Sequence, residues 1–512
     1  MIAAKRQHMR MRWPASAVGL LGALACMCLV SVACGGDKPV ARTMTDKEIT
    51  SAVEEELIFD QAVPFYDIDV STTRGVVMLA GSVNNLLAKD RAVALAETVK
   101  GVRSVVDRIT VKPIWTRTDE QIESDAQNAL LSDPATDLYE VDVSVSNNVA
   151  TLTGTVDSWQ EKELVAQVVK GVKGVTGIKN EISVDYKTDR VDREIRPEIE
   201  SALQWDTLVD HALIDVTVDD GHVTLGGIVG SAAEKRRAEQ DAWVAGVKSV
   251  NGSKLDVERW ARDEDLRKNK YVAKTDEELE SAVSAALLYD PRVASFNVDV
   301  DASGYTVTLR GAVDNLQAKR AAEQDARNTV GVYWVKNQIK VRPELALTDE
   351  EVANNVKSAL ARDPFVERYE IRVSVANNTV YLSGDVDSYF EKGRAETVAS
   401  LAPGVRDVKN YLDVEPGPLA YNPYVDEDYF YLEDWYDHGP FHTLVPDSVI
   451  RDEIKDELWW SPFVNESDVK VSVEKGIATL TGTVDSFSEY NAATEEAYEG
   501  GAAWVYNKLK VD

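Results

Sequence analysis

The stretch Val149-Ala-Thr-Leu-Thr-Gly-Thr-Val156 contains the pattern Leu-x-Gly-x-Val, and this pattern occurs six times in the 512-residue chain. In every occurrence a large aliphatic residue lies 32 positions before the glycine, as Ile122 lies before Gly154. A constant offset in six places indicates an internal repeat, because copies of one structural unit keep their internal spacing. The repeat glycines are Gly81, Gly154, Gly227, Gly311, Gly384 and Gly482.

Each copy begins with a predicted helix. In the second copy Ile122, Ala126 and Leu130 recur every four residues, which places them on one face of a helix. Thr118 and Gln121 form a capping-box sequence, in which each side chain satisfies a free backbone N–H at the helix start. Matching pairs open three other copies: Thr45 with Glu48, Thr275 with Glu278, and Thr348 with Glu351.

A hairpin and a second helix follow. Residues 140–145 alternate between polar and apolar side chains, as a half-buried strand does, and Asn147-Asn148 predicts a tight turn into a second strand. We expect Gly154 to allow a helix backbone to approach the sheet closely. Asp157 is the expected N-cap of the second helix. Lysine recurs eight residues after the glycine in five copies and is replaced by Tyr490 in the sixth: Lys89, Lys162, Lys235, Lys319 and Lys392.

A third strand closes the unit, as at residues 337–341. A strand–helix–strand connection returns the third strand in the direction of the second, so the sheet is mixed. The predicted fold class is α+β: a tandem array of six small α-β-β-α-β modules, each with two helices packed on a three-stranded mixed sheet.

This order of elements, the Leu-x-Gly-x-Val strand and the ending Gly-Val…Asn-x-Ile-x-Val between Gly331 and Val341 resemble the BON domain. That module is named for bacterial osmotically inducible periplasmic proteins and nodulation proteins. The resemblance implies residence in the cell envelope, a role in stress resistance and, in some members, phospholipid binding; it implies no catalysis. The third copy departs from the pattern at Gly230-Ser231, and the sixth has Gly501-Ala502 in place of Gly-Val.

The repeat spacing predicts the domain boundaries. The BON-like copies 1 to 6 are expected at residues 45–113, 118–186, 190–257, 275–343, 347–415 and 447–512. A charged linker at 258–274 and an acidic, aromatic linker at 416–446 account for the two longer spacings.

The N-terminus has the pattern of a signal peptide at residues 1–33. A basic start is followed by an apolar stretch and by Ala33-Cys34, which resembles the bacterial lipobox, although Ser31 stands where leucine is usual. This resemblance implies acylation of Cys34. By resemblance to enteric lipoproteins, Gly35 in place of an aspartate after the cysteine implies anchoring in the outer membrane, facing the periplasm. Cys26 is a weaker second candidate, and an uncleaved transmembrane anchor is the alternative interpretation.

Composition narrows the function. The formal net charge is −31, which argues against nucleic acid as a partner. The three cysteines all precede residue 35, and no phosphate-binding loop or nucleophile motif is found, so we expect neither an enzyme nor a cofactor. Near Asp434 and Asp437, His438 and His442 could bind a metal, but chance histidines in a linker are the preferred interpretation, so no metal site is predicted.

Aromatic residues at helix ends are the candidate contact sites. One set lies near the end of the first helix, outside the stripe of core residues: Phe59, Trp205, Tyr289 and Trp460, with Phe463 shortly after. A second set lies just inside the second helix: Trp159, Tyr389 and Phe487. Exposed aromatic residues there suit a membrane interface or a protein partner. The alternative is that they pack between neighbouring modules or beneath loops.

Two functions remain open. The first is an envelope lipoprotein whose repeats bind membrane phospholipid and support envelope integrity or osmotic stress resistance. The second is a periplasmic scaffold or adaptor that binds an envelope protein, which the acidic charge favours.

Overall fold

Each repeat folds into the predicted α-β-β-α-β unit, which confirms the fold class. In the computed structural model the described residues are 44–64, 67–136, 140–187, 190–262, 270, 273–294, 296–343, 346–366, 371–414, 446–461, 463–502 and 504–511, and those from 44 onward form one compact unit. Residues 1–43, including Cys34, and residues 415–445, including the linker histidines, lie outside this description.

The first three copies have the following elements. Copy 1 consists of α1 (Asp46–Phe59), β1 (Ile68–Thr73), β2 (Val76–Val83), α2 (Leu86–Thr98) and β3 (Ser104–Val111). Copy 2 consists of α3 (Asp119–Ser132), β4 (Val141–Ser146), β5 (Val149–Val156), α4 (Trp159–Lys170), β6 (Gly177–Asn180) and β7 (Ser183–Val184). Copy 3 consists of α5 (Asp192–Trp205), β8 (Ile214–Asp219), β9 (His222–Val229), α6 (Ala232–Asp241) and β10 (Ser249–Val257).

The last three copies repeat this order. Copy 4 consists of α8 (Asp276–Tyr289), β11 (Val298–Ser303), β12 (Thr306–Val313), α9 (Leu316–Arg327), β13 (Trp334–Asn337) and β14 (Lys340–Val341). Copy 5 consists of α10 (Asp349–Arg362), β15 (Ile371–Ala376), β16 (Thr379–Val386), α11 (Tyr389–Leu401) and β17 (Asp407–Val414). Copy 6 consists of α12 (Asp447–Trp460), β18 (Val469–Glu474), β19 (Ile477–Val484), α13 (Phe487–Glu499) and β20 (Trp504–Val511).

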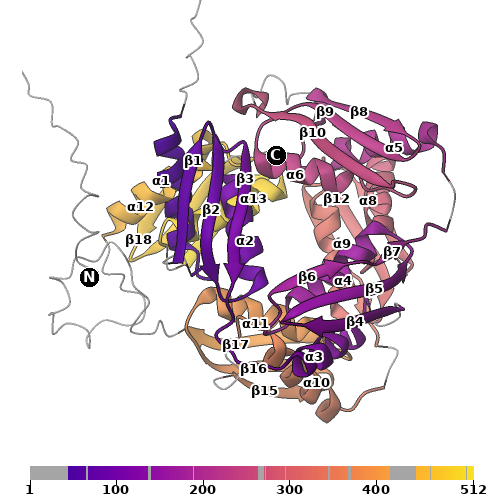
Figure 1. Ribbon diagram of the computed structural model, residues 1–512. Helices are drawn as coiled ribbons and strands as arrows, with labels where there is room; N and C mark the ends of the chain where they lie inside the picture. Colours follow the sequence, from indigo (N-terminus) through magenta and orange to yellow (C-terminus); the bar gives the residue numbers. More distant parts are fainter. Residues whose placement is uncertain are drawn as a thin grey trace, which may run out of the picture. The chain divides into compact units, whose positions relative to one another are not determined.

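Every sheet is mixed, with its middle strand antiparallel to the first strand and parallel to the third. In copy 2, Leu152 of β5 is paired with Val143 of β4 and with Asn180 of β6. In copies 2 and 4 the third strand is interrupted and forms two short segments, β6 and β7 or β13 and β14. The two helices lie on one face of the sheet, as α3 and α4 do in copy 2 (Figure 1).

The first helix also holds the hairpin turn. The four predicted capping boxes are present. Asp119, the first residue of α3, accepts hydrogen bonds from the backbone N–H groups of Asn147 and Asn148, both of which have positive φ. The equivalent aspartates of four other copies bind their turns in the same way: Asp46, Asp192, Asp349 and Asp447. This repeated clamp fixes the helix and hairpin of each copy together.

The repeat glycine has a different role from the one expected. Gly154 has φ +138°, and a Cβ atom there would lie 2.2 Å from the carbonyl oxygen of Glu140. The close neighbour is therefore the chain entering β4 and not a helix backbone. Because a side chain would clash with this carbonyl and strain the backbone, only glycine fits.

The second helix begins one residue later than predicted. Its N-cap in copy 2 is Ser158, whose hydroxyl accepts from Glu161 N–H, while Asp157 N–H donates to the Glu161 carboxylate. The recurring lysine of this helix has a structural role in copies 1 to 3, since Lys162 Nζ donates to the Ile182 carbonyl at 2.7 Å, with equivalent bonds from Lys89 and Lys235. It thereby caps the edge of the third strand.

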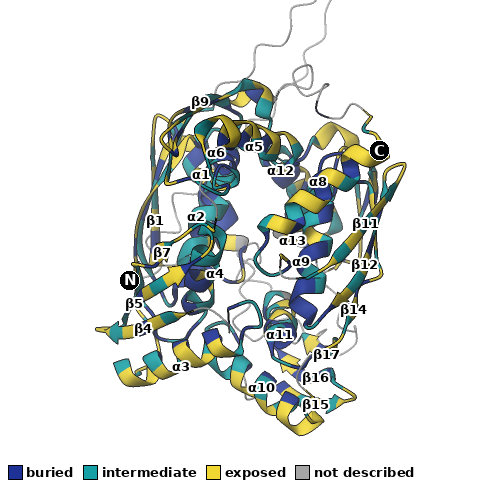
Figure 2. Ribbon diagram, turned by 90° about the vertical axis from the view of Figure 1, so that its right-hand side faces the viewer, coloured by how far each residue is buried: buried dark blue, intermediate teal, exposed yellow. Residues whose placement is uncertain are grey.

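Each copy has its own apolar core between helices and sheet. In copy 2 Ile122, Ala126, Leu152 and Val165 are fully buried. Buried residues concentrate on the helix faces that meet the sheet (Figure 2). The predicted core stripe of the first helix is therefore confirmed.

Candidate functional site

The aromatic residues at the ends of the first helices pack on the cores of other copies. Trp205 of copy 3 packs on the core of copy 4, and Tyr289 of copy 4 packs on the core of copy 3. Trp460 of copy 6 packs on the core of copy 1. They lie off the core stripe of their own module, as predicted, but other copies cover them, which favours the alternative of packing between modules.

The same backbone hydrogen bond joins the copies in three pairs. Val330 N–H donates to the Trp205 carbonyl at 2.9 Å, joining copies 3 and 4. Lys173 N–H donates to the Arg362 carbonyl at 2.8 Å, joining copies 2 and 5, and Lys100 N–H donates to Trp460 at 3.3 Å, joining copies 1 and 6. Each donor directly precedes the glycine after the second helix, and each acceptor ends a first helix. The junction is thus a repeated feature of the module.

Aromatic residues of the second helices are also in contacts between copies. Trp159 stacks on Trp243 of copy 3 with ring centroids 5.1 Å apart. Phe487 is buried and lies against Trp334 and Arg327 of copy 4. The side chains of Phe59 and Tyr389 lie outside the described residues.

The junction of copies 3 and 4 contains buried charges. Arg237 donates two hydrogen bonds to Asp206, at 2.8 and 2.6 Å, and its Nε lies 3.3 Å from Asp241. Burial, and then the nearby Asp206, raise the pKa of Asp241 well above its usual range. In copy 4, Arg292 pairs with Asp290, and burial raises the pKa of Asp325 in the same way. Cations thus offset part of the buried negative charge.

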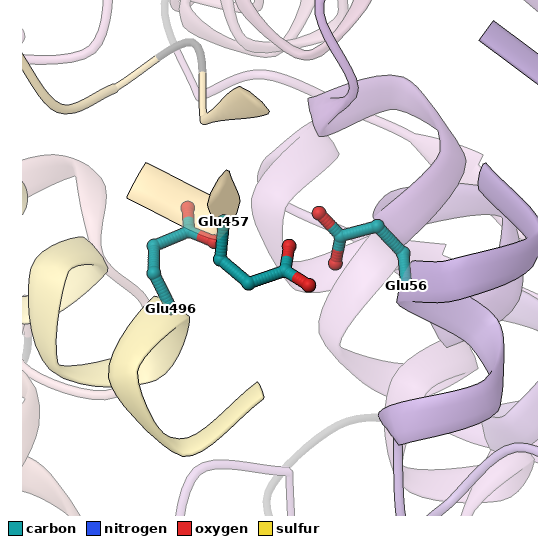
Figure 3. A group of neighbouring side chains, drawn as sticks. All are labelled: Glu56, Glu457 and Glu496. Carbon is teal, nitrogen blue, oxygen red and sulfur yellow. The ribbon is translucent and has the colours of Figure 1, made fainter. Parts of the chain in front are cut away.

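The junction of copies 1 and 6 contains an additional cluster of carboxylates beside the ion pair of Arg91 with Asp60. Glu56 of α1, Glu457 of α12 and Glu496 of α13 are buried and turn toward one another, with oxygens within 4.8 Å (Figure 3). Burial also raises the pKa of the nearby Glu453 and Glu495. Three carboxylates are part of the six to eight oxygen ligands that Ca²⁺ takes, so the described residues do not supply a complete calcium site.

A comparison of the copies could have revealed these positions in the sequence. Glu56 and Glu457 occupy one position of the first helix, where the other four copies have Ala129, Ala202, Ala286 and Ala359. Asp241, Asp325 and Glu496 occupy one position of the second helix, where the remaining copies have Leu95, Val168 and Val398. Acidic residues at otherwise apolar positions mark the two charged junctions.

A groove runs beside β20 in copy 6. Its volume is about 990 Å³, and it lies between β20, α13 and residues of copies 3 and 4. Phe463, Tyr490, Trp504 and Tyr506 supply aromatic surface to it. Phe463 is thus the sequence-predicted contact residue that lines an open site.

No described helix has both the length and the apolar character needed to cross a bilayer. Within the described residues, the half-buried His211 has a pKa lowered by burial and by the Lys270 ammonium group. The same ammonium group donates hydrogen bonds to the carbonyls of Thr207 and Val209 and therefore stabilises a loop.

The chain is similar to two curated proteins and to one solved structure. The chain is 31% identical over 149 residues to osmotically-inducible protein Y of Escherichia coli, covering 28% of this chain and 74% of that protein. It is 30% identical over 138 residues to the outer membrane lipoprotein DolP of Haemophilus influenzae, covering 26% and 71%. Among solved structures, the C-terminal domain of CdsD from the type III secretion system of Chlamydia trachomatis matches with a TM-score of 0.12 and 14% identity, covering 42% of this chain and all of that domain.

The BON domain itself matches six segments: residues 45–113, 118–186, 191–259, 275–343, 348–416 and 446–512. These segments include every copy described above. The chain therefore belongs to the BON domain family and contains six tandem BON domains.

Proposed function

We propose that this protein is a non-enzymatic lipoprotein of the bacterial cell envelope whose six BON domains form a scaffold. The observation that carries this proposal is the use of equivalent helix ends to join copies 1 and 6, 2 and 5, and 3 and 4. Because aromatic side chains such as Trp205 and Trp460 are in these junctions, the array functions as one body that presents its remaining surfaces to a partner. The two linkers, 258–274 and 416–446, connect the copies.

The envelope location is supported by the names of the relatives. One is an osmotically inducible protein and the other is an outer membrane lipoprotein. We infer that residues 1–33 are removed as a signal peptide, that Cys34 is acylated, and that the chain is held at the outer membrane in the periplasm. A role in envelope integrity or osmotic stress resistance follows from this location.

Acylation is tested by metabolic labelling with a fatty acid. The wild-type chain should incorporate the label, Cys34→Ala should lose it, and Cys26→Ala should keep it. Label retained in Cys34→Ala but lost in Cys26→Ala would move the modification to Cys26. Absence of label in the wild type, with the protein in the membrane fraction, would favour the uncleaved anchor.

Phospholipid binding through the repeats is a second candidate function, favoured by one surface of copy 6. Lys470, Lys508 and Lys510 share the helix-free sheet face with Trp504 and Tyr506, and basic and aromatic residues together suit anionic headgroups. Flotation of the purified chain with phosphatidylglycerol vesicles tests this function, with phosphatidylcholine vesicles as the control. Equal recovery of the protein in the floating fraction with and without vesicles would contradict phospholipid binding. The scaffold would then be the remaining proposed function.

A further inference from the structure

We propose that the groove beside β20 binds an extended, acidic segment of a partner protein, which adds to the sheet of copy 6 as a fourth strand. This inference rests on the scaffold function proposed above and names the chemistry of its partner. Four observations carry it: an open strand edge, a lysine replaced by tyrosine, the walls of the groove, and a local positive charge.

The strand edge provides the main-chain groups for such a partner. In the described residues β20 pairs with β19 on one side and with no strand on the other. Asn507 C=O accepts from the hydroxyl of Tyr490 on α13, so this carbonyl faces away from β19. Because backbone groups alternate in direction along a strand, the N–H and C=O of Val505 face the same open side. An extended peptide binds a sheet through groups of this kind.

The edge of β20 lacks the lysine contact of copies 1 to 3 and is held more loosely, by Tyr490, which donates to Asn507 C=O, and by Asn507 Oδ1, which accepts from Leu509 N–H. An added strand would pair with Val505 and replace the Tyr490 hydroxyl at Asn507. In copies 1 to 3 the ammonium groups of Lys89, Lys162 and Lys235 donate to the third-strand carbonyl beside the repeat glycine. Charged side chains, lysine above all, are a common protection of edge strands. Tyr490 stands at this position in copy 6 and bonds to Asn507, two residues before the equivalent carbonyl of Leu509.

Residues of three copies line the groove. Asn491 and Glu495 of α13 form one wall, and Leu208 and Asn328 of copies 3 and 4 form another. The volume of about 990 Å³ lies at the upper end of the range of ligand sites in proteins, roughly 300–1,000 Å³. Five consecutive residues of β20, 504–508, line it, which is the length over which a short strand pairs.

Charge selects an acidic partner. Lys508 lines the groove, and Lys470 and Lys510 lie on the same exposed sheet face, in a chain whose net charge is −31. A partner with carboxylates on the side chains that face Lys508 therefore complements this surface, while the main chain pairs with β20.

The test uses the purified full-length protein and a fluorescein-labelled nonapeptide that alternates aspartate and valine. A lysine–valine peptide controls for charge. An aspartate–valine peptide that is N-methylated at alternate residues controls for strand pairing, because it lacks the N–H donors. Lys508→Glu and Asn491→Trp alter the groove by charge and by volume, and Arg108→Glu changes an exposed cation at the same strand position in copy 1.

Binding of the aspartate–valine peptide is expected to weaken by about tenfold or more in both groove variants and to stay unchanged in Arg108→Glu. Hydrogen exchange of residues 504–509 should slow when the peptide is bound. Equal binding of the N-methylated peptide, unaltered binding in the folded groove variants, or no binding at all would each overturn the proposal. Binding of phosphatidylglycerol vesicles without peptide binding would assign the surface to lipid, and neither result affects the Cys34 labelling.

Discussion

The junction of copies 3 and 4 and the junction of copies 1 and 6 share a backbone hydrogen bond but differ in the charges beside it. In the first, Arg237 and Arg292 lie among aspartates. In the second, Arg91 pairs with Asp60, and Glu56 and Glu457 in addition lie close to Glu496. The difference shows that the fold supplies the site of contact, while a few positions give each junction its own chemistry.

The junction of copies 2 and 5 provides a third chemistry at the same positions. Val168 and Val398 stand where Asp241 and Asp325 stand in copies 3 and 4, and Ala129 and Ala359 line the same small cavity of about 250 Å³. The junction of copies 2 and 5 also contains the ion pair of Arg394 with the buried Asp363, so the three junctions differ at these two positions and not in whether they contain charge. A carboxylate at either position would lie partly against apolar surface in copies 2 and 5, which is costly. We expect these positions to contribute to which copies pair.

Removal of a junction cation should have the largest effect. Arg237→Ala leaves Asp206 and Asp241 buried without their common partner. This loss should destabilise the junction of copies 3 and 4 by about 3 kcal/mol. The value is at the low end for a broken buried ion pair because the Arg237 side chain is 37% exposed. The free energy of local opening, measured by hydrogen exchange in α6, reports this loss.

Arg394→Ala is the matched control. Arg394 of copy 5 pairs with Asp363 as Arg237 pairs with Asp206, but the position of Asp241 is occupied by Val398 in copy 5. Arg394→Ala should lower the free energy of local opening by less than Arg237→Ala does. Equal losses in the two variants would show that Asp241 adds nothing to the role of Arg237.

Adding a carboxylate to the junction of copies 2 and 5 should have an intermediate effect. Val168→Asp places a carboxylate in a half-buried position and should cost up to about 2 kcal/mol. Leu164 stands where copy 3 has its arginine, and Arg362 and Arg394 of copy 5 across the cavity offset only part of the charge. Hydrogen exchange in α4 and α10 measures this change. Val168→Ala separates the loss of volume from the added charge, and a similar loss in both variants would contradict the charge argument.

Reducing the charge of the carboxylate junction should have the smallest effect and the opposite sign. Glu457→Gln should stabilise the junction of copies 1 and 6 by about 1 kcal/mol at pH 8, because like charges lie close together there. Local opening of α12 and α1 provides the measurement. Glu457→Ala, which copies the residue of copies 2 to 5, tests whether lost packing cancels the gain.

The stability of the junction of copies 1 and 6 should depend on pH. Burial raises the pKa values of Glu453 and Glu495 above the ordinary value of 4.5, so the folded junction binds more protons than the unfolded chain. Their contribution is fully present below about pH 4.5 and is lost as the pH rises through the raised folded values. The junction of copies 1 and 6 should therefore loosen as the pH rises above about 4.5, once intrinsic exchange rates are corrected for. The junction of copies 2 and 5, which lacks these glutamates, should loosen less.

The internal structure of a copy could be predicted because its determinants are local and repeated. Thr118 with Gln121, Asn147-Asn148 and the stripe from Ile122 to Leu130 each fix an element within a few residues. The N-cap was placed one residue early because Asp157 and Ser158 both suit the position, and only the bond to Glu161 N–H distinguishes them.

The contacts between copies could not be predicted from periodicity. Trp205 and Trp460 were recognised as off the core stripe, but helical geometry alone does not say whether solvent, lipid or another copy covers a side chain. The groove beside β20 depends on α13, β20 and residues as distant in sequence as Leu208, so only the replacement of lysine by Tyr490 marked it in the sequence.

The three junctions are nested along the chain: copies 3 and 4 pair inside copies 2 and 5, which pair inside copies 1 and 6. Such an order lets assembly proceed from the centre outward, because each closed pair brings the next two copies near each other. The entropy lost in closing each outer loop is then that of a short connection and not of the whole intervening chain. Copies 1 and 2 must wait for copies 6 and 5 to be synthesised, so the ends of the chain meet last, and a truncation that removes copy 6 should leave the inner two pairs assembled.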